Sequence, residues 1–108
     1  MPIITRIEYD DARLSEGEAR ELSAAAQRIV AEAIGIDEVF VYTNTAQIKV
    51  NIAPVLMTIE MGAHRTAFAE QYGAEIKEKL GTWKQENGHG YPVYLTVTPV
   101  NMTAVGEF

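Results

Sequence analysis

The chain has 108 residues, which suits one compact domain and leaves no room for two of ordinary size. Hydrophobic residues make up 47% of the sequence and charged residues 22%, the balance of a globular protein rather than a disordered chain. The net charge of −6 argues against nucleic acid and anionic membrane surfaces as partners. The absence of cysteine excludes disulfides, thiolate zinc sites and a cysteine nucleophile.

Two histidines are too few for a histidine-rich metal site. No apolar stretch approaches the ~18 residues that a membrane span requires. The first residues also lack the basic-then-apolar pattern of a secretion signal. We therefore expect a cytoplasmic protein.

The first half of the chain predicts a strand, a helix and a second strand. Residues 2–9 form a β-branched run typical of a strand. Residues 15–34 predict a helix that begins with a capping box, Ser-Glu-Gly-Glu, and Gly35 suits its C-terminal end. A strand opens at 39–42, and residues 47–52 alternate polar and apolar side chains, as a half-exposed strand or hairpin arm does.

The second half repeats this order at an offset of about 53 residues, although the residue identities do not repeat. Residues 55–61 predict a strand, a helix is expected from about residue 66, and residues 92–100 predict the last strand. The apolar face of that helix is marked by Phe68, Tyr72, Ile76, Leu80 and Trp83.

The predicted fold class is therefore α/β (α+β), with two tandem β-α-β units in a single domain spanning residues 1–108. The repeated halves are about 2–53 and 55–108. Right-handed crossovers place both helices on one face of a four-stranded mixed sheet. The other face would be left uncovered as a large apolar patch, which favours an oligomer that buries it.

Pro2 is the candidate catalytic residue. Removal of the methionine ahead of it leaves a proline whose nitrogen is a secondary amine. An α-amino group titrates near 7.7–8.0 when unperturbed, and burial in an apolar site lowers that pKa toward the range of a general base. Proline at a strand start also has a purely conformational use, so the dipeptide alone does not decide its role.

Three features together resemble the tautomerase superfamily, and in particular its long-chain branch, that of macrophage migration inhibitory factor. They are the Met-Pro start followed by a β-branched strand, the two β-α-β units, and two local segments. Residues 93–96 and 101–106 resemble the last strand of that branch and the Asn-Ala-Ala-Asn-Val-Gly segment after it. Residues 59–62 resemble the end of the third strand, which lies beside the catalytic proline.

The resemblance implies a homotrimer with sites at subunit interfaces, the N-terminal proline as acid or base, and a small carboxylate substrate. An arginine can hold such a carboxylate through two parallel hydrogen bonds. Arg13 follows the first strand, where short-chain relatives keep an arginine, and Arg65 follows the third strand, where some decarboxylases do. We expect Arg65 near Pro2 on the premise that strands one and three are parallel. A solvated surface arginine is the alternative for each.

Four further positions are compared with the family. Tyr94 matches a tyrosine that lines the pocket from a neighbouring subunit, and it could equally be an interface aromatic. Lys49 is a weaker candidate substrate cation. Phe40 stands where short-chain relatives have a second arginine, and Glu60 is not clearly the water-activating glutamate of dehalogenases, so hydrolytic dehalogenation is disfavoured.

The predicted activity is keto–enol tautomerisation or isomerisation of a small α-keto or unsaturated carboxylate, without metal or organic cofactor. Alternatives are decarboxylation or hydration by a protonated Pro2, and a non-catalytic trimeric binding protein that keeps the fold. The pair Asp10–Asp11 is expected to be a solvated turn, and His64 a loop histidine without a role.

Overall fold

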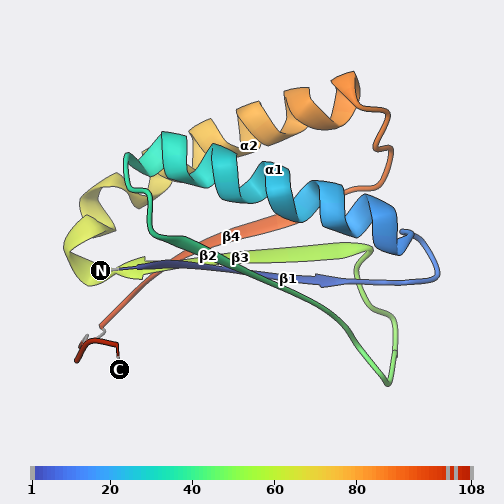
Figure 1. Cartoon of the computed structure of the whole chain (residues 1–108), viewed down its shortest axis with the longest axis horizontal. Helices are drawn as coiled ribbons and strands as arrows, with labels where there is room; N and C mark the ends of the chain where they lie inside the picture. Colours follow the sequence, from blue (N-terminus) through green and yellow to red (C-terminus); the bar gives the residue numbers. More distant parts are fainter. Residues whose placement is uncertain (1, 102, 104, 108) are drawn as a thin grey trace.

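The computed structural model describes residues 2–101, 103 and 105–107, and shows two β-α-β units in sequence (Figure 1). Met102 and Ala104, part of the segment that resembles the family, lie outside the described residues. The elements are β1 (Ile3–Tyr9), α1 (Glu16–Ile34), β2 (Val39–Thr45), β3 (Val55–Gly62), the 3-10 helix η1 (Ala63–Phe68), α2 (Ala69–Glu86) and β4 (Tyr94–Val100). The predicted α+β class and element order are confirmed.

The ends of α1 follow the predicted local chemistry. The Ser15 hydroxyl accepts a hydrogen bond from the Glu18 backbone N–H at 3.0 Å, and the Glu18 carboxylate accepts one from the Ser15 N–H at 3.0 Å. Gly35 closes the helix in the left-handed conformation, with φ of 75°, where a side chain would be strained.

The sheet has the order β2-β1-β3-β4 and is mixed. β1 pairs in parallel with β2, and β3 with β4, but β1 and β3 are antiparallel. The premise that strands one and three are parallel was therefore wrong. Since Ile4 pairs with Glu60, the start of β1 lies beside the end of β3.

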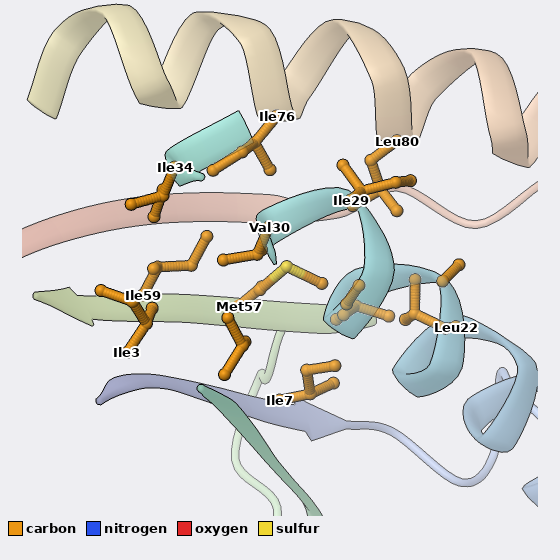
Figure 2. Packing of buried hydrophobic residues seen from close by; sticks show 14 of the residues in the cluster. Ile3, Ile7, Leu22, Ile29, Val30, Ile34, Met57, Ile59, Ile76 and Leu80 are labelled. Atoms are coloured by element: carbon orange, nitrogen blue, oxygen red, sulfur yellow. The ribbon is translucent and has the colours of Figure 1, made fainter. Parts of the chain in front are cut away.

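Both helices cover the same face of the sheet, as predicted (Figure 1). Alternate residues of β1 and β3 pack against them, and Figure 2 shows Ile3, Ile7, Met57 and Ile59 below the two helices. Of the predicted apolar face of α2, Ile76 and Leu80 are buried, and Tyr72 and Trp83 pack against the core. Phe68 is instead the last residue of η1, since α2 begins at Ala69, and its side chain is half exposed.

Residues 47–52 do not form the predicted strand or hairpin arm. They belong to the connection between β2 and β3, residues 46–54, which projects from one end of the sheet (Figure 1). No sheet neighbour reaches this segment within the described chain, so its alternating pattern has no ladder to join. Neither helix of the described residues has the length and apolar character that crossing a membrane requires.

The face of the sheet away from the helices is only partly apolar. Its exposed large hydrophobic side chains are Phe40, Tyr42, Leu56 and Tyr94. Between them, the Arg6 guanidinium lies 3.2 Å from the Glu60 carboxylate and 5.7 Å from the centre of the Tyr42 ring. The face without helices is therefore present as predicted, but the Arg6–Glu60 ion pair lies among its apolar side chains.

Candidate functional site

Pro2 lies directly ahead of β1 and is half-buried. The strand start is fixed, because the Ile3 N–H donates to the Glu38 carbonyl at 2.9 Å. Continuing the antiparallel register by two residues places Pro2 opposite Gly62, the last residue of β3. The proline ring therefore lies at the end of the sheet where β3 passes into η1.

Arg65 is carried by η1, so the structure brings it to the end of the sheet that holds Pro2. Arg65 therefore lies at the same end of the sheet as Pro2, as expected, but the premise of parallel strands was wrong. In a parallel pair the end of β3 would lie beside the end of β1, away from Pro2. The antiparallel pairing places it beside the start of β1. Arg65 is half-buried, while His64 beside it is exposed. None of the ion pairs between described residues involves Arg65. Its guanidinium therefore has no carboxylate partner among them.

Arg13 and Lys49 lie at the other end of β1. The Lys49 ammonium donates to the Asp10 carboxylate at 2.9 Å and also to Asp11, and Arg13 lies 3.7 Å from Asp10. The Lys49 and Ala12 hydrogen bonds to Asp10 lower its pKa, and the two carboxylates raise the pKa of Lys49. The expected solvated turn is wrong for Asp10, which is buried in this cluster.

Tyr94 belongs to the same end as Arg13 and Lys49. It opens β4, is exposed on the open face of the sheet, and pairs in register with Leu56 near the start of β3. Within one chain it lies far from the start of β1.

The predicted site residues therefore form two groups at opposite ends of the sheet. Pro2 and Arg65 are at one end, and Arg13, Lys49 and Tyr94 are at the other. The seven residues of β1 separate the groups by roughly 20 Å at the usual rise of a strand. One chain cannot bring all five side chains to one small substrate, whereas a second copy could supply one group to the other.

The two departures from the family pattern both lie on the open face. Phe40 projects from edge strand β2 and is half exposed. The Glu60 carboxylate accepts a hydrogen bond from the Arg6 guanidinium.

A buried polar cluster at the α2–β4 connection was missed by sequence analysis. The His89 ring lies between the Glu21 carboxylate, 2.8 Å from Nε2, and the Tyr91 hydroxyl, 2.7 Å from Nδ1. Burial raises the pKa of Tyr91, and burial likewise lowers the pKa of Lys84, whose ammonium lies 5.1 Å from the Tyr91 ring centre. The separation of 68 residues between His89 and Glu21 left no local signal for this contact.

The cluster borders a cavity of about 360 Å³ lined by Arg13, Glu18 and Tyr91 among others. Because a carboxylate only accepts, Nε2 of His89 donates to Glu21, and in the neutral imidazole Nδ1 accepts the Tyr91 O–H. The Tyr91 hydroxyl therefore donates its proton within the cluster. We interpret the cluster as a structural link between α1 and the entry into β4.

Several solved structures share this fold. An FG41 malonate semialdehyde decarboxylase is 18% identical, with a TM-score of 0.63 over 99% of this chain and 90% of its own. A 5-carboxymethyl-2-hydroxymuconate isomerase from Deinococcus radiodurans R1 is 14% identical, with a TM-score of 0.64 over 98% and 87%. A macrophage migration inhibitory factor from Toxoplasma gondii is 16% identical, with a TM-score of 0.56 over 91% and 90%.

These structures are members of the tautomerase superfamily, so the chain has the tautomerase fold. At these identities the likeness concerns the fold alone. No family model and no curated protein sequence matches the chain.

Proposed function

We propose that the chain is a cofactor-independent tautomerase or isomerase that uses Pro2 as a general base on a small α-keto or unsaturated carboxylate. The observation that carries the proposal is the position of Pro2. A half-buried proline stands directly ahead of β1, in a fold shared with isomerases and decarboxylases, at the sheet end that also carries Arg65.

The proposed reaction is a proton transfer within one substrate. Once the preceding methionine is removed, the Pro2 nitrogen takes the proton from the enol oxygen, and the resulting ammonium returns it to the neighbouring carbon. The half-buried position favours the neutral amine relative to full solvent exposure. The Arg65 guanidinium, without a carboxylate partner among the described residues, is the proposed holder of the substrate carboxylate.

The proposed functional unit is a homotrimer. The separation of Pro2 and Arg65 from Arg13, Lys49 and Tyr94 supports a site shared between copies. The exposed side chains on the open face support burial of that face in the assembly. Tyr94 of a neighbouring copy would then donate a hydrogen bond to developing enolate charge.

The test is ketonisation of phenylenolpyruvate by the purified protein and by Pro2→Ala. The expected result is a rate well above the uncatalysed one, reduced by a factor of about 100 or more in Pro2→Ala, because general bases contribute on this scale. The matched control is Pro54→Ala, at the far end of β1. Equal activity of wild type and Pro2→Ala would refute the role of Pro2, and equal inertness would favour a non-catalytic binding protein.

The intact mass of the purified protein belongs with this assay. Loss of one methionine from the full mass is expected, because a retained residue would acylate the Pro2 nitrogen and abolish its basicity. A mass that includes Met1, together with full activity, would exclude the proposed base.

Decarboxylation is the second candidate, favoured by the 99% coverage of this chain in the comparison with malonate semialdehyde decarboxylase. In that case Pro2 would be protonated and would polarise the substrate carbonyl while carbon dioxide leaves. The dependence of kcat/KM on pH distinguishes the two, since the base requires activity to rise with pH and the acid requires it to fall.

A further inference from the structure

Arg6 and Glu60 form an ion pair close to Pro2 that the proposed reaction does not use. The Arg6 Nε donates to the Glu60 carboxylate at 3.2 Å, and the two side chains are 55% and 28% exposed. Ion pairs at a protein surface contribute little to stability. This pair, however, joins the strand that begins at Pro2 to the strand that leads to Arg65. Its position therefore points to an effect on the site.

The sheet register places the Glu60 side chain between Pro2 and Arg6. Glu60 pairs with Ile4, which is midway between these two residues along the chain. Because Ile3 packs in the core beneath the helices, alternation puts Pro2, Ile4 and Arg6 on the opposite, open face. Diagonal neighbours on one face of an antiparallel pair lie about 7–8 Å apart. Glu60 is thus a diagonal neighbour of both Pro2 and Arg6, and Arg6 binds its carboxylate.

Two contacts fix the Arg6 guanidinium in this place. β1 lies between β2 and β3, and Arg6 pairs in register with Tyr42 on β2 and Thr58 on β3. The guanidinium lies 5.7 Å from the centre of the Tyr42 ring, within the range of a cation–π contact. Its Nε reaches the Glu60 carboxylate on the other side. The positive charge is therefore held by both neighbouring strands.

Other charged side chains lie at the same end of the sheet. Asp37 and Glu38 precede β2, while His64 and Arg65 belong to η1 after β3. Asp37, Glu38 and His64 are exposed, so water and salt screen them. Strand β4 carries no charged side chain along its length. The half-buried charges of Glu60 and Arg65 should therefore act on Pro2 more strongly than the exposed ones.

An uncompensated Glu60 carboxylate would oppose the proposed role of Pro2. A negative charge near an amine favours the protonated form and raises the pKa of the amine. At about 7–8 Å in a partly exposed site, this rise would be about one pH unit. With Arg6 bound to Glu60, the two charges largely cancel at Pro2. The field of Arg65 then remains, and a positive charge favours the neutral amine.

We propose that Arg6 is a positioning residue for the Pro2 site, which holds the Glu60 carboxylate and balances its charge so that the Pro2 nitrogen stays neutral. Arg6 touches neither the substrate nor the transferred proton and acts through Glu60. The inference rests on the proposed function where it gives the Pro2 nitrogen a part in proton transfer. The electrostatic effect on that nitrogen exists whether or not the protein is catalytic.

NMR of the Pro2 ring tests this effect without any substrate. The protein is labelled with isotope-enriched proline and treated with methionine aminopeptidase, and the pKa of the Pro2 amine is read from its pH titration. Arg6→Gln is expected to raise this pKa by about one unit. Arg6→Lys keeps the positive charge and should stay close to wild type. Arg6→Gln combined with Glu60→Gln removes both charges and should return the pKa close to the wild-type value.

Arg20→Gln is the matched control. Arg20 forms an ion pair with Glu16 at 2.8 Å near the start of α1, which follows the far end of β1. The variant removes the same charge from an ion pair far from Pro2, so the pKa of the Pro2 amine should not change. The Arg6 and Arg20 side chains are both more than half exposed, so the far-ultraviolet circular dichroism should be that of wild type in each variant.

The same variants give a kinetic signature in the ketonisation of phenylenolpyruvate. In Arg6→Gln the rise of kcat/KM with pH should move about one unit toward higher pH, which lowers kcat/KM about tenfold on the acid side. At high pH, where Pro2 is neutral in both proteins, wild type and variant should be equally active. A structural defect would instead lower the activity at every pH.

The outcomes of the titration separate this proposal from the proposed function. An unchanged or lowered pKa of the Pro2 amine in Arg6→Gln would overturn the role of Arg6, and so would a rise that Glu60→Gln fails to reverse. The expected shifts in a protein that is inert toward phenylenolpyruvate would support the action of Arg6 on the Pro2 nitrogen and refute the proposed function instead.

Discussion

The His89 cluster gives the sharpest stability prediction, because one ring holds two buried contacts. His89→Ala removes the acceptor of the Tyr91 O–H and the donor to Glu21. Tyr91 is buried, and an unsatisfied buried hydroxyl costs about 1–3 kcal/mol. The bond to Glu21 contributes less, about 1 kcal/mol, because the carboxylate side chain is 65% exposed.

His89→Ala also removes the contact between the His89 and Trp83 rings, whose centres are 4.6 Å apart, and this loss of packing lowers the stability further. The expected total is a fall of about 3 kcal/mol in the free energy of unfolding, large for a domain of this size. Urea titration at one protein concentration measures this fall, with fluorescence of Trp83, the only tryptophan, as the probe.

Tyr91→Phe provides the decisive control. Alone it should cost about 1 kcal/mol, the net value of one hydrogen bond. In that background His89→Ala should cost about 1 kcal/mol less than in wild type, because no hydroxyl remains to be left unsatisfied. Costs that add within about 0.5 kcal/mol would refute the proposed coupling, and a His89→Ala loss under 1 kcal/mol would refute the burial argument itself.

Three other predictions concern stability. Thr5→Val should raise the free energy of unfolding by about 1 kcal/mol in a urea titration, because the buried Thr5 hydroxyl has no partner among the described residues; a loss would indicate an unseen partner. Ser15→Ala should lower it by about 1 kcal/mol through loss of the α1 cap, and an unchanged midpoint would contradict the cap. Asp10 has a lowered pKa, so its stabilising effect is present above the unfolded value near 3.9 and is lost as pH falls through the folded value. Asp10→Asn should therefore reduce the fall in the free energy of unfolding as the pH is lowered. The same fall in wild type and variant would refute the stabilising role of the Lys49–Asp10 contact.

Local sequence predicted the elements well because each depended on neighbouring residues. The capping box and Gly35 defined α1 to the residue, and β-branched runs located the strands, although β2 extends three residues beyond its expected end. The repeat of strand, helix and strand was sufficient for the class and for helices on one face. The proposal of Pro2 as the catalytic residue came from its place in the chain and from the family resemblance, neither of which needs tertiary information.

Relations between distant segments were decided only by the folded chain. The antiparallel pairing of β1 with β3 depends on how the two halves dock, and no local pattern encodes it. Because of that pairing, Arg65 lies at the end of the sheet that holds Pro2. Arg13, Lys49 and Tyr94 lie at the opposite end. The Glu21–His89–Tyr91 cluster likewise joins residues brought together by helix packing. Periodicity in residues 47–52 predicted an alternating segment but could not show whether a strand lies beside it. A ladder requires a neighbouring strand, and the described residues of one chain supply none there.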